Sequence, residues 1–319
     1  MSNTKYLIVG GAGFIGSHLC DELLNRGDEV FCIDNFITGN KKNIEHLIKN
    51  SSFHLIEWDI TKTLDKNLQS QISTVQFIYH LASPASPIQY QRFPIETLLA
   101  NSLGTYNLLM LAKEINARFL YASSSEIYGD PLQHPQKEPY WGNVNPIGIR
   151  SCYDEGKRFG EAIIMAFIRK FDLDCRLARI FNTYGPRMEK EDGRVVSNFI
   201  VQALLGKPIT VYGDGSQTRS FCFVSDMVAG LMKLMEEEKA RGEVFNLGNP
   251  EEYTILEIAR KIKDRTASVS EIKFNDLPED DPVRRQPDIT RAKQILGWQP
   301  IISIDQGLGQ TIKYFESIL

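Results

Sequence analysis

Two short strings in the middle of the chain carry residues that can move a proton: Ser123–Glu126 (SSSE) and Tyr153-x-x-x-Lys157. Residues four apart lie on the same face of a helix, so the Lys157 ammonium would lie beside the Tyr153 phenol. A nearby positive charge lowers the pKa of a phenol from about 10, which makes tyrosinate a usable base for a substrate hydroxyl. We expect the Ser124 hydroxyl, from the end of a strand, to complete a relay to that oxygen.

A Tyr-x-x-x-Lys pair also occurs in ordinary amphipathic helices, so its meaning depends on the rest of the chain. At the N-terminus, a short apolar strand at Lys5–Val9 leads into GGAGFIG (Gly10–Gly16) and a helical pattern from Phe14 to about residue 26. A second strand, Glu29–Ile33, stops at Asp34. Strand, glycines, helix, strand and acid in this order are typical of dinucleotide binding, whereas the alternative is a glycine-rich turn without a ligand.

In that arrangement, the acid at the end of the second strand binds both hydroxyls of a ribose. A carboxylate at Asp34 would repel a 2′-phosphate, so the sequence favours NAD over NADP as the cofactor.

Strand and helix patterns alternate through about residue 180. We expect further strands at Phe53–Glu57, Val75–His80, Phe119–Ser123 and Cys175–Arg179, and helices over about residues 94–114, 153–170 and 227–239. Strands separated by helices indicate an α/β fold with a Rossmann-type, doubly wound parallel sheet, which binds ligands at the carboxyl ends of its strands. Ser124 and Asn182 both lie just past such strands.

One long segment, residues 129–150, has neither periodicity and is rich in Pro, Gly and Asn. It is too long for an incidental connection. Two interpretations stay open: a lid that faces the substrate, or a surface excursion.

Composition is that of a water-soluble enzyme. The 319 residues carry a net charge of −4 with no basic stripe, which argues against a nucleic-acid partner. The five histidines show no metal-ligand spacing, so no metal site is expected. No apolar stretch reaches membrane-spanning length, and the first apolar segment leads straight into the glycine loop, so neither a membrane partner nor a signal peptide is expected.

The cysteines favour a cytoplasmic location. They are odd in number, scattered and without a CxxC pair, which is typical of reduced thiols, mostly in the core. Their positions are Cys20, Cys32, Cys152, Cys175 and Cys222.

Taken together, these motifs resemble the extended short-chain dehydrogenase/reductase superfamily of nucleotide-sugar enzymes. Within it, longer strings resemble the UDP-glucuronate decarboxylases, also called UDP-xylose synthases, over essentially the whole chain. The strings are HLASPASP, YGDP, YWGNVNPIG, CYDEGKR, ARIFNTYGPR, DGRVVSNFI, GSQTR and NLGNPEE.

The resemblance implies roles for particular residues. Ser124, Tyr153 and Lys157 would form the catalytic triad, and Glu126 would orient substrate or water unless it is a structural carboxylate. The UDP-sugar substrate would be held through its diphosphate by Asn182, Arg187, Arg194, Tyr212 and Arg219. NAD would be lined by Gly10, Gly13, Phe14, Ile15, Gly16, Asp34, Asn35, Thr38, Gly39, Asp59, Ile60, Leu81, Ser83, Ala122, Tyr153 and Lys157.

The resemblance also implies an organisation. Residues 1–180 would form the NAD-binding Rossmann domain, rejoined by about 221–247, and residues 181–319 would form mainly the smaller nucleotide-sugar-binding lobe. The helices near 94–114 and 153–170 carry apolar positions beyond one buried face. In this superfamily such helices pair across a two-fold axis as a four-helix bundle, which implies a homodimer.

Two positions separate the candidate reactions. A 4,6-dehydratase needs an acid beside its Glu base and carries Asp-Glu, whereas this chain carries Ser125-Glu126. Arg285 falls where decarboxylases have an Arg that reaches the sugar, while dehydratases and 4-epimerases usually have Tyr. It is expected to bind the carboxylate or to aid protonation, and the alternative is a surface salt-bridge residue.

The expected reaction follows: oxidation at carbon-4 of UDP-glucuronate, loss of carbon dioxide, protonation at carbon-5 and reduction to UDP-xylose, with NAD recycled. The alternatives are a nucleotide-sugar 4-epimerase or 4,6-dehydratase, and an NAD-binding protein without catalysis.

The chain departs from the family pattern at two places. Ser124 replaces a common Thr, and Leu99 stands where many relatives have a lysine that can approach substrate, so Arg285 would carry more of the charge complementarity.

Overall fold

The computed structural model describes residues 3–277 and 284–319. Within these residues the centre is a seven-stranded parallel sheet with the strand order β11-β6-β5-β4-β1-β2-β3. Its strands are β1 (Lys5–Val9), β2 (Glu29–Asp34), β3 (Phe53–Glu57), β4 (Phe77–His80), β5 (Arg118–Ser124), β6 (Cys175–Ile180) and β11 (Val244–Leu247). The order 3-2-1-4-5-6 confirms the predicted doubly wound fold.

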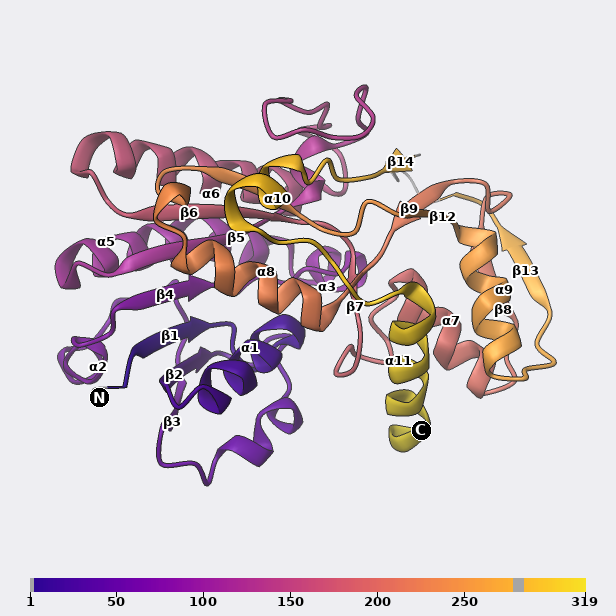
Figure 1. Ribbon diagram of the computed structural model, residues 1–319, viewed down its shortest axis with the longest axis horizontal. Coiled ribbons are helices and arrows are strands. Elements are labelled where there is room, and N and C mark those ends of the chain that lie inside the picture. The colour runs from indigo at the N-terminus through magenta and orange to yellow at the C-terminus, as the bar shows by residue number, and fades with distance from the viewer. Residues whose placement is uncertain (1–2, 278–283) are drawn as a thin grey trace.

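Helices cover both faces of this sheet (Figure 1). Alternate side chains of β1 enter different cores, Tyr6 and Ile8 on one face and Leu7 and Val9 on the other, as the period of two in a strand requires. One face is covered by α1 (Phe14–Asn25) and α8 (Val224–Glu236), and the other by α5 (Thr105–Ile115) and α6 (Ser151–Phe171). Because both faces are buried, the central strands are rich in apolar residues.

The predicted helix over residues 94–114 is interrupted. It consists of α4 (Pro94–Leu99), a π-helical segment at Ala100–Gly104, and α5. A wide turn of this kind changes the direction of the side chains on it, and such turns are frequent at functional sites. The sequence pattern did not predict this wider π-helical turn.

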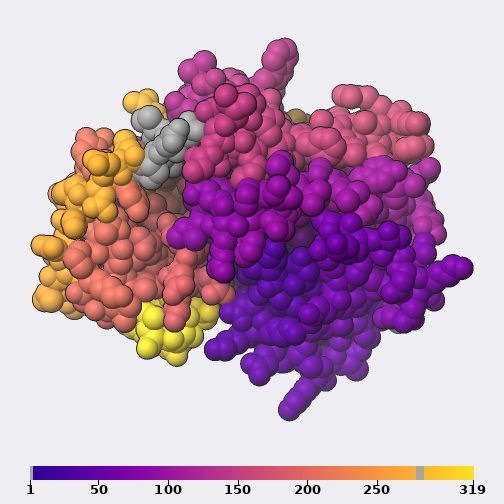
Figure 2. Space-filling view, turned by 180° about the vertical axis from the view of Figure 1, so that it is seen from behind, coloured from indigo at the N-terminus to yellow at the C-terminus, as the bar shows by residue number. Residues whose placement is uncertain are grey.

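Residues after β6 build a smaller lobe beside the sheet (Figures 1 and 2). Its elements are α7 (Val195–Leu204), β8 (Ile209–Tyr212), β9 (Thr218–Ser220), β12 (Glu252–Thr254), α9 (Ile255–Arg265), β13 (Ile272–Asn275), β14 (Arg284–Arg285) and α11 (Ile304–Ile318). Shorter elements complete the chain: α2 (Lys66–Ile72), α3 (Pro87–Arg92), β7 (Thr183–Tyr184), β10 (Cys222–Phe223) and α10 (Thr290–Leu296).

The chain returns to the sheet after it enters this lobe. Helix α8 packs on β6, and β11 pairs with β6 in parallel. On this basis we propose the division suggested by the sequence, with residues 1–180 and about 221–247 in the Rossmann unit and the remaining C-terminal residues mainly in the lobe.

Several boundaries differ slightly from the sequence expectation. Asp34 and Ser124 are the last residues of β2 and β5 rather than the residues after them. The helix expected over residues 227–239 begins at Val224 and ends at Glu236. All five cysteines are buried free thiols.

Residues 129–150 contain no regular helix, as expected, but one edge of the segment is buried. Bridges join Gly129 to Asn143 and Gln136 to Pro287. Gln136 is fully buried, whereas Trp141 and Ile147 are exposed. In the described part of the chain, none of the helices combines the length and the apolar character needed to cross a membrane.

Candidate active site

The glycine turn after β1 is packed too tightly for any side chain. Gly10 has φ +84°, and a Cβ there would lie 2.7 Å from the Ala82 nitrogen. A Cβ on Gly16 would lie 2.2 Å from the Gly10 oxygen. Only glycine allows the backbone to pack this closely here. With no side chains at these positions, the backbone at the start of α1 can be approached by a ligand.

Asp34 lies beside this turn. Its Oδ2 accepts a hydrogen bond from the Ala12 nitrogen at 2.9 Å and its Oδ1 accepts one from the Phe36 nitrogen at 2.9 Å. Burial raises the pKa of Asp34, and the backbone N–H donors oppose that rise. A Cβ on Gly39 would lie 2.5 Å from Oδ1, so this glycine leaves room around the carboxylate.

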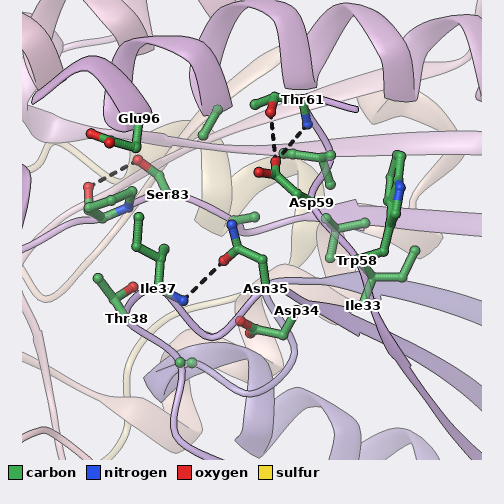
Figure 3. Close-up of a pocket in the computed structure, with 18 of the residues that line it drawn as sticks. Ile33, Asp34, Asn35, Ile37, Thr38, Trp58, Asp59, Thr61, Ser83 and Glu96 are labelled. Atoms are coloured by element: carbon green, nitrogen blue, oxygen red, sulfur yellow. Dashed lines mark hydrogen bonds between the residues drawn. The ribbon is translucent and has the colours of Figure 1, made fainter. Parts of the chain in front are cut away.

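A cavity of about 220 Å³ opens next to Asp34 (Figure 3). Asn35 Oδ1 accepts from the Ile37 nitrogen at 3.1 Å, and Asp59 Oδ1 accepts from the nitrogen and hydroxyl of Thr61 at 2.9 and 2.8 Å, which fixes two turns of its wall. The predicted NAD residues on this wall are Gly10, Gly13, Asp34, Asn35, Thr38, Gly39, Asp59, Ile60, Leu81 and Ser83.

Sequence reasoning missed Trp58, Ile37 and Glu96 on the same wall. Trp58 stands next to the predicted Asp59, so its position at a strand end was a usable signal. Glu96 comes from α4, and nothing in the sequence ties that helix to the glycine loop.

A second cavity of about 820 Å³ adjoins the first, and both are lined by Gly10, Gly13, Leu81 and Ser83. Its walls come from the carboxyl ends of β5 and β6, the start of α6 and the C-terminal lobe. Predicted residues that line it are Phe14, Ile15, Gly16, Thr38, Ala122, Ser124, Ser125, Glu126, Tyr153, Lys157, Asn182, Arg187, Arg194, Tyr212 and Arg219.

Tyr153 and Lys157 lie one turn apart at the start of α6, facing the end of β5. The Lys157 Nζ lies 5.7 Å from the centre of the Tyr153 ring and donates to the Ala122 oxygen at 2.7 Å. The Tyr90 ring stacks on Tyr153 at 5.1 Å between ring centres, which fixes the plane of the phenol. Sequence reasoning did not identify Tyr90.

The expectation that Lys157 lowers the pKa of Tyr153 is wrong for this structure. Burial raises the pKa of Tyr153 to about 12, although the Ser124 hydroxyl and the charge of Arg194 act to lower it. Burial also lowers the pKa of Lys157 to about 7, opposed by Glu161. Desolvation disfavours the charged form of each group and is the largest influence on both pKa values.

Glu126 is held between two guanidinium groups. Arg285 Nη1 donates to Glu126 Oε1 at 3.1 Å, and Arg150 Nη2 donates to Glu126 Oε2. Burial raises the pKa of Glu126, but the charges of Arg285 and Arg150 more than offset this rise and lower the pKa to about 2. Arg150 ends the 129–150 segment, which gave no sequence signal for a site residue.

Arg285 differs from the expectation. It is 1% exposed and is the one predicted residue, among those the structure describes, that lines neither cavity. Its guanidinium lies behind the acid, donating to Ser125 Oγ at 3.1 Å and the Gly129 oxygen at 2.8 Å. Arg285 contacts Glu126, and because it is buried it is not the surface salt-bridge residue of the alternative. Its expected contact with the sugar stays a prediction.

Leu99 also has a different place from the one the family comparison implied. It lines the smaller cavity with Ser83 and Ala100, and is not among the residues of the larger one. The π-helical turn next to it brings Asn101 Nδ2 to Ser83 Oγ at 2.8 Å.

Three arginines form one wall of the larger cavity. Arg187 pairs with Asp21 at 2.6 Å, Arg194 pairs with Asp192 at 2.5 Å, and Arg219 is mostly buried. Arginine suits phosphate oxygens because its guanidinium donates in a fixed fork. In the described residues, no group of three or more His, Cys, Asp or Glu side chains is placed to hold a metal ion.

The chain is similar to one family model and to several known proteins. The family model for GDP-mannose 4,6 dehydratase matches residues 7–311. UDP-glucuronic acid decarboxylase 2 of Arabidopsis thaliana is 54% identical over 98% of this chain and 68% of its own length. UDP-glucuronic acid decarboxylase 1 of Danio rerio is 54% identical over 98% of this chain and 72% of its own.

This chain belongs to the UDP-glucuronic acid decarboxylase family.

Solved structures of more distant relatives share the fold. A UDP-glucuronic acid 4-epimerase from Bacillus cereus, in complex with UDP-glucuronic acid and NAD, is 29% identical with a TM-score of 0.90, covering 99% of this chain and 100% of the other. Ser125 and Glu126 therefore belong to a decarboxylase-family chain on a scaffold that also occurs in epimerases.

Proposed function

We propose that this chain converts UDP-glucuronate to UDP-xylose and carbon dioxide, with NAD as a recycled cofactor. The observation that carries the proposal is the group formed by Ser125, Glu126 and Arg285, on the wall of the larger cavity and directly behind it. Family membership over nearly the whole chain supports it.

The residues present fit NAD. The close packing at Gly10 and Gly16 leaves a backbone cradle for a pyrophosphate, and Asp34 lies at the end of β2 where a ribose diol can bind. The smaller cavity, between Ile60, Trp58 and Ile37, suits a flat adenine. When bound, NAD supplies a hydride acceptor for carbon-4 of the sugar and the hydride that returns at the end.

Tyr153 is the proposed base for the carbon-4 hydroxyl, with Ser124 completing the relay. Because burial raises the pKa of Tyr153 to about 12, the phenolate needs positive charge close by. Arg194 and Ser124 lower the pKa from the chain's side, and Lys157 lies within 5.7 Å of the ring.

A ketone at carbon-4 is β to the carboxylate at carbon-6, so the electron pair left by departing carbon dioxide is delocalised into an enolate. The overall change is UDP-glucuronate plus a proton to UDP-xylose plus carbon dioxide. Glu126 is proposed to orient the sugar or a water molecule, since Arg285 and Arg150 keep it ionised. Ser125, lacking the acidity of an aspartate, supplies no acid for dehydration and places no second carboxylate near that of the sugar.

The UDP part of the substrate is assigned to the arginine wall. Arg187, Arg194 and Arg219 supply charge for the diphosphate, and Asn182 and Tyr212 line the same cavity. With buried free thiols, the protein is proposed to work in the reducing cytoplasm.

We also propose a homodimer. Helices α4 and α5, with the turn between them, expose a line of apolar side chains, and α6 exposes Phe159. The exposed line is Ile95, Leu98, Leu99, Leu103, Tyr106 and Met110. Their pairing with the same helices of a second copy would bury this line as a four-helix bundle.

One assay tests the proposed reaction: product analysis after incubation with UDP-glucuronate and a catalytic amount of NAD. Carbon dioxide and a UDP-pentose in equal amounts are the expected products. The fold shared with a UDP-glucuronic acid 4-epimerase makes UDP-galacturonate the second candidate product. Its formation without carbon dioxide would overturn the proposal.

A further inference from the structure

The position of Arg285 depends on a short strap, which we define as residues 284–288. Arg284 and Arg285 form β14, which pairs in parallel with β9 so that Arg285 lies opposite Arg219. The Ser220 hydroxyl donates to the Arg285 oxygen at 3.3 Å. A strand pair of two residues gives little rigidity by itself, so the strap needs support from elsewhere.

That support comes from Gln136, in the 129–150 segment. The side-chain Oε1 of Gln136 accepts a hydrogen bond from the main-chain nitrogen of Gln286 at 2.8 Å. The main-chain nitrogen of Gln136 donates to the main-chain oxygen of Gln286 at 2.9 Å, and its main-chain oxygen accepts from the main-chain nitrogen of Asp288 at 2.8 Å. Three hydrogen bonds therefore hold the strap on both sides of Pro287.

Gln136 is itself held firmly. It is fully buried, and its Nε2 donates to the Gln133 oxygen at 2.8 Å. Asn246 Nδ2, from β11 of the central sheet, donates to the Gln136 oxygen at 3.0 Å and to the Asp288 oxygen at 3.1 Å. Through these hydrogen bonds, Gln136 and Asn246 connect the strap to the central sheet. They explain why one edge of the irregular 129–150 segment is buried.

Arg285 immediately precedes Gln286, so a shift of the strap moves its guanidinium. That guanidinium donates to Glu126 and to Ser125 from behind the cavity. Glu126 would keep Arg150 but lose its other partner, leaving a buried carboxylate less well compensated.

We propose that Gln136 is a positioning residue for the reaction: it fixes the strap so that Arg285 holds Glu126 in place. The inference rests on the proposed decarboxylation. It predicts that Gln136 affects chemistry only through Arg285, and that it contributes little to the affinity for either ligand.

The test is a double-mutant cycle with Gln136→Met, which keeps the length of the side chain and removes its two side-chain hydrogen bonds, to the Gln286 nitrogen and the Gln133 oxygen, while the two main-chain bonds remain. In the wild-type background we expect kcat for carbon dioxide release to fall about tenfold, a change of about 1.4 kcal/mol. KM for UDP-glucuronate and the dissociation constant of NAD should change less than about twofold. In an Arg285→Gln background the same substitution should change kcat less than twofold.

The acid limb of the kcat profile provides a second readout. Arg285 is the largest of the influences that lower the pKa of Glu126, so loosening it should move that limb to higher pH. Asp226→Asn is the matched control, because Asp226 Oδ2 accepts from the nitrogens of Ile301 and Ile302 at 3.0 and 2.8 Å and lines neither cavity. It should lower the melting temperature without shifting the limb.

Multiplicative losses in the two backgrounds, or an unshifted limb, would overturn the inference. If Gln136→Met does not fold, the shorter Gln136→Asn tests the same prediction, since its amide no longer reaches the Gln286 nitrogen. A wild type that releases no carbon dioxide would overturn the proposed function instead, so the two failures are distinguishable.

Discussion

Burial and neighbouring charges together set the pKa values of the proposed catalytic residues. Tyr153, Lys157 and Glu126 all lie at the larger cavity, yet their pKa values move for different reasons. Desolvation raises that of Tyr153 and lowers that of Lys157, whereas two arginines overcome desolvation at Glu126. The sequence predicted that Lys157 lowers the pKa of Tyr153. That prediction failed because the cost of burying a charge depends on surroundings that the sequence pattern does not reveal.

Tyr153→Phe tests the base directly. The substitution keeps the ring that stacks on Tyr90 and removes only the phenolic oxygen. We expect NAD and UDP-glucuronate to bind nearly normally and kcat to fall by a factor of at least about 100. Ligand titration and steady-state rates measure the two effects. Retention of half of the wild-type kcat would contradict the assignment.

Lys157→Met tests the cost of the buried ammonium. The pKa of Lys157 is about 7 in the folded protein and 10.5 in a model compound, so between these values the unfolded chain binds more protons than the native one. The contribution of Lys157 to the stability of the wild type should therefore become less unfavourable from pH 7 to pH 10. The variant, free of this cost, should be more stable at pH 7 by at least about 1 kcal/mol, and inactive.

Denaturant unfolding at pH 7, 8.5 and 10 measures this difference between Lys157→Met and the wild type. It should shrink as the pH rises. A difference that stays constant with pH would show that Lys157 is not desolvated as the structure indicates.

Strands and glycines were the elements that the sequence predicted best. The strand at Lys5–Val9 is bounded as expected, because four consecutive apolar residues (Tyr6–Val9) before a glycine turn leave few alternatives. The π-helical turn at Ala100–Gly104 and the buried edge of residues 129–150 were not predicted, since both arise from long-range packing. The role of Arg150 and the contact between Arg285 and Glu126 were missed for the same reason. Each of the other predicted site residues lines at least one of the two cavities.

Gly16→Ala tests the glycine turn as a cofactor cradle. The new Cβ would lie 2.2 Å from the Gly10 oxygen, so the turn must shift. We expect the affinity for NAD to fall at least about tenfold, about 1.4 kcal/mol, as measured by calorimetry.

Gly309→Ala, in α11, is the matched control for Gly16→Ala. A Cβ there meets no atom within 4 Å, so NAD affinity should be unchanged. Equal affinities in both variants would argue against the proposed pyrophosphate site.

The site as a whole belongs to both parts of the molecule. The end of β5 supplies Ser124 and the short 3-10 turn that follows it supplies Glu126. The C-terminal lobe supplies Arg219 and, through the strap, Arg285. Figure 2 shows the C-terminal segments lying against the N-terminal half. The exposed apolar line on α4 and α5 has no partner within the described chain.

Leu103→Glu combined with Tyr106→Glu tests the proposed dimer. Two charges on the exposed line should prevent burial against a second copy, so the variant should sediment as a monomer where the wild type is a dimer at micromolar concentration. A monomeric wild type would contradict the four-helix bundle.

In the proposed reaction the enzyme removes the carboxylate and returns a proton to carbon-5 while NAD is recycled. The most direct measurement is an NMR time course of UDP-glucuronate in deuterated water with NAD far below the substrate concentration. The proposed reaction predicts UDP-xylose with one deuterium at carbon-5 and many turnovers for each NAD. A UDP-hexuronate product with its carboxylate intact, or a reaction that stops after one turnover for each NAD, would contradict it.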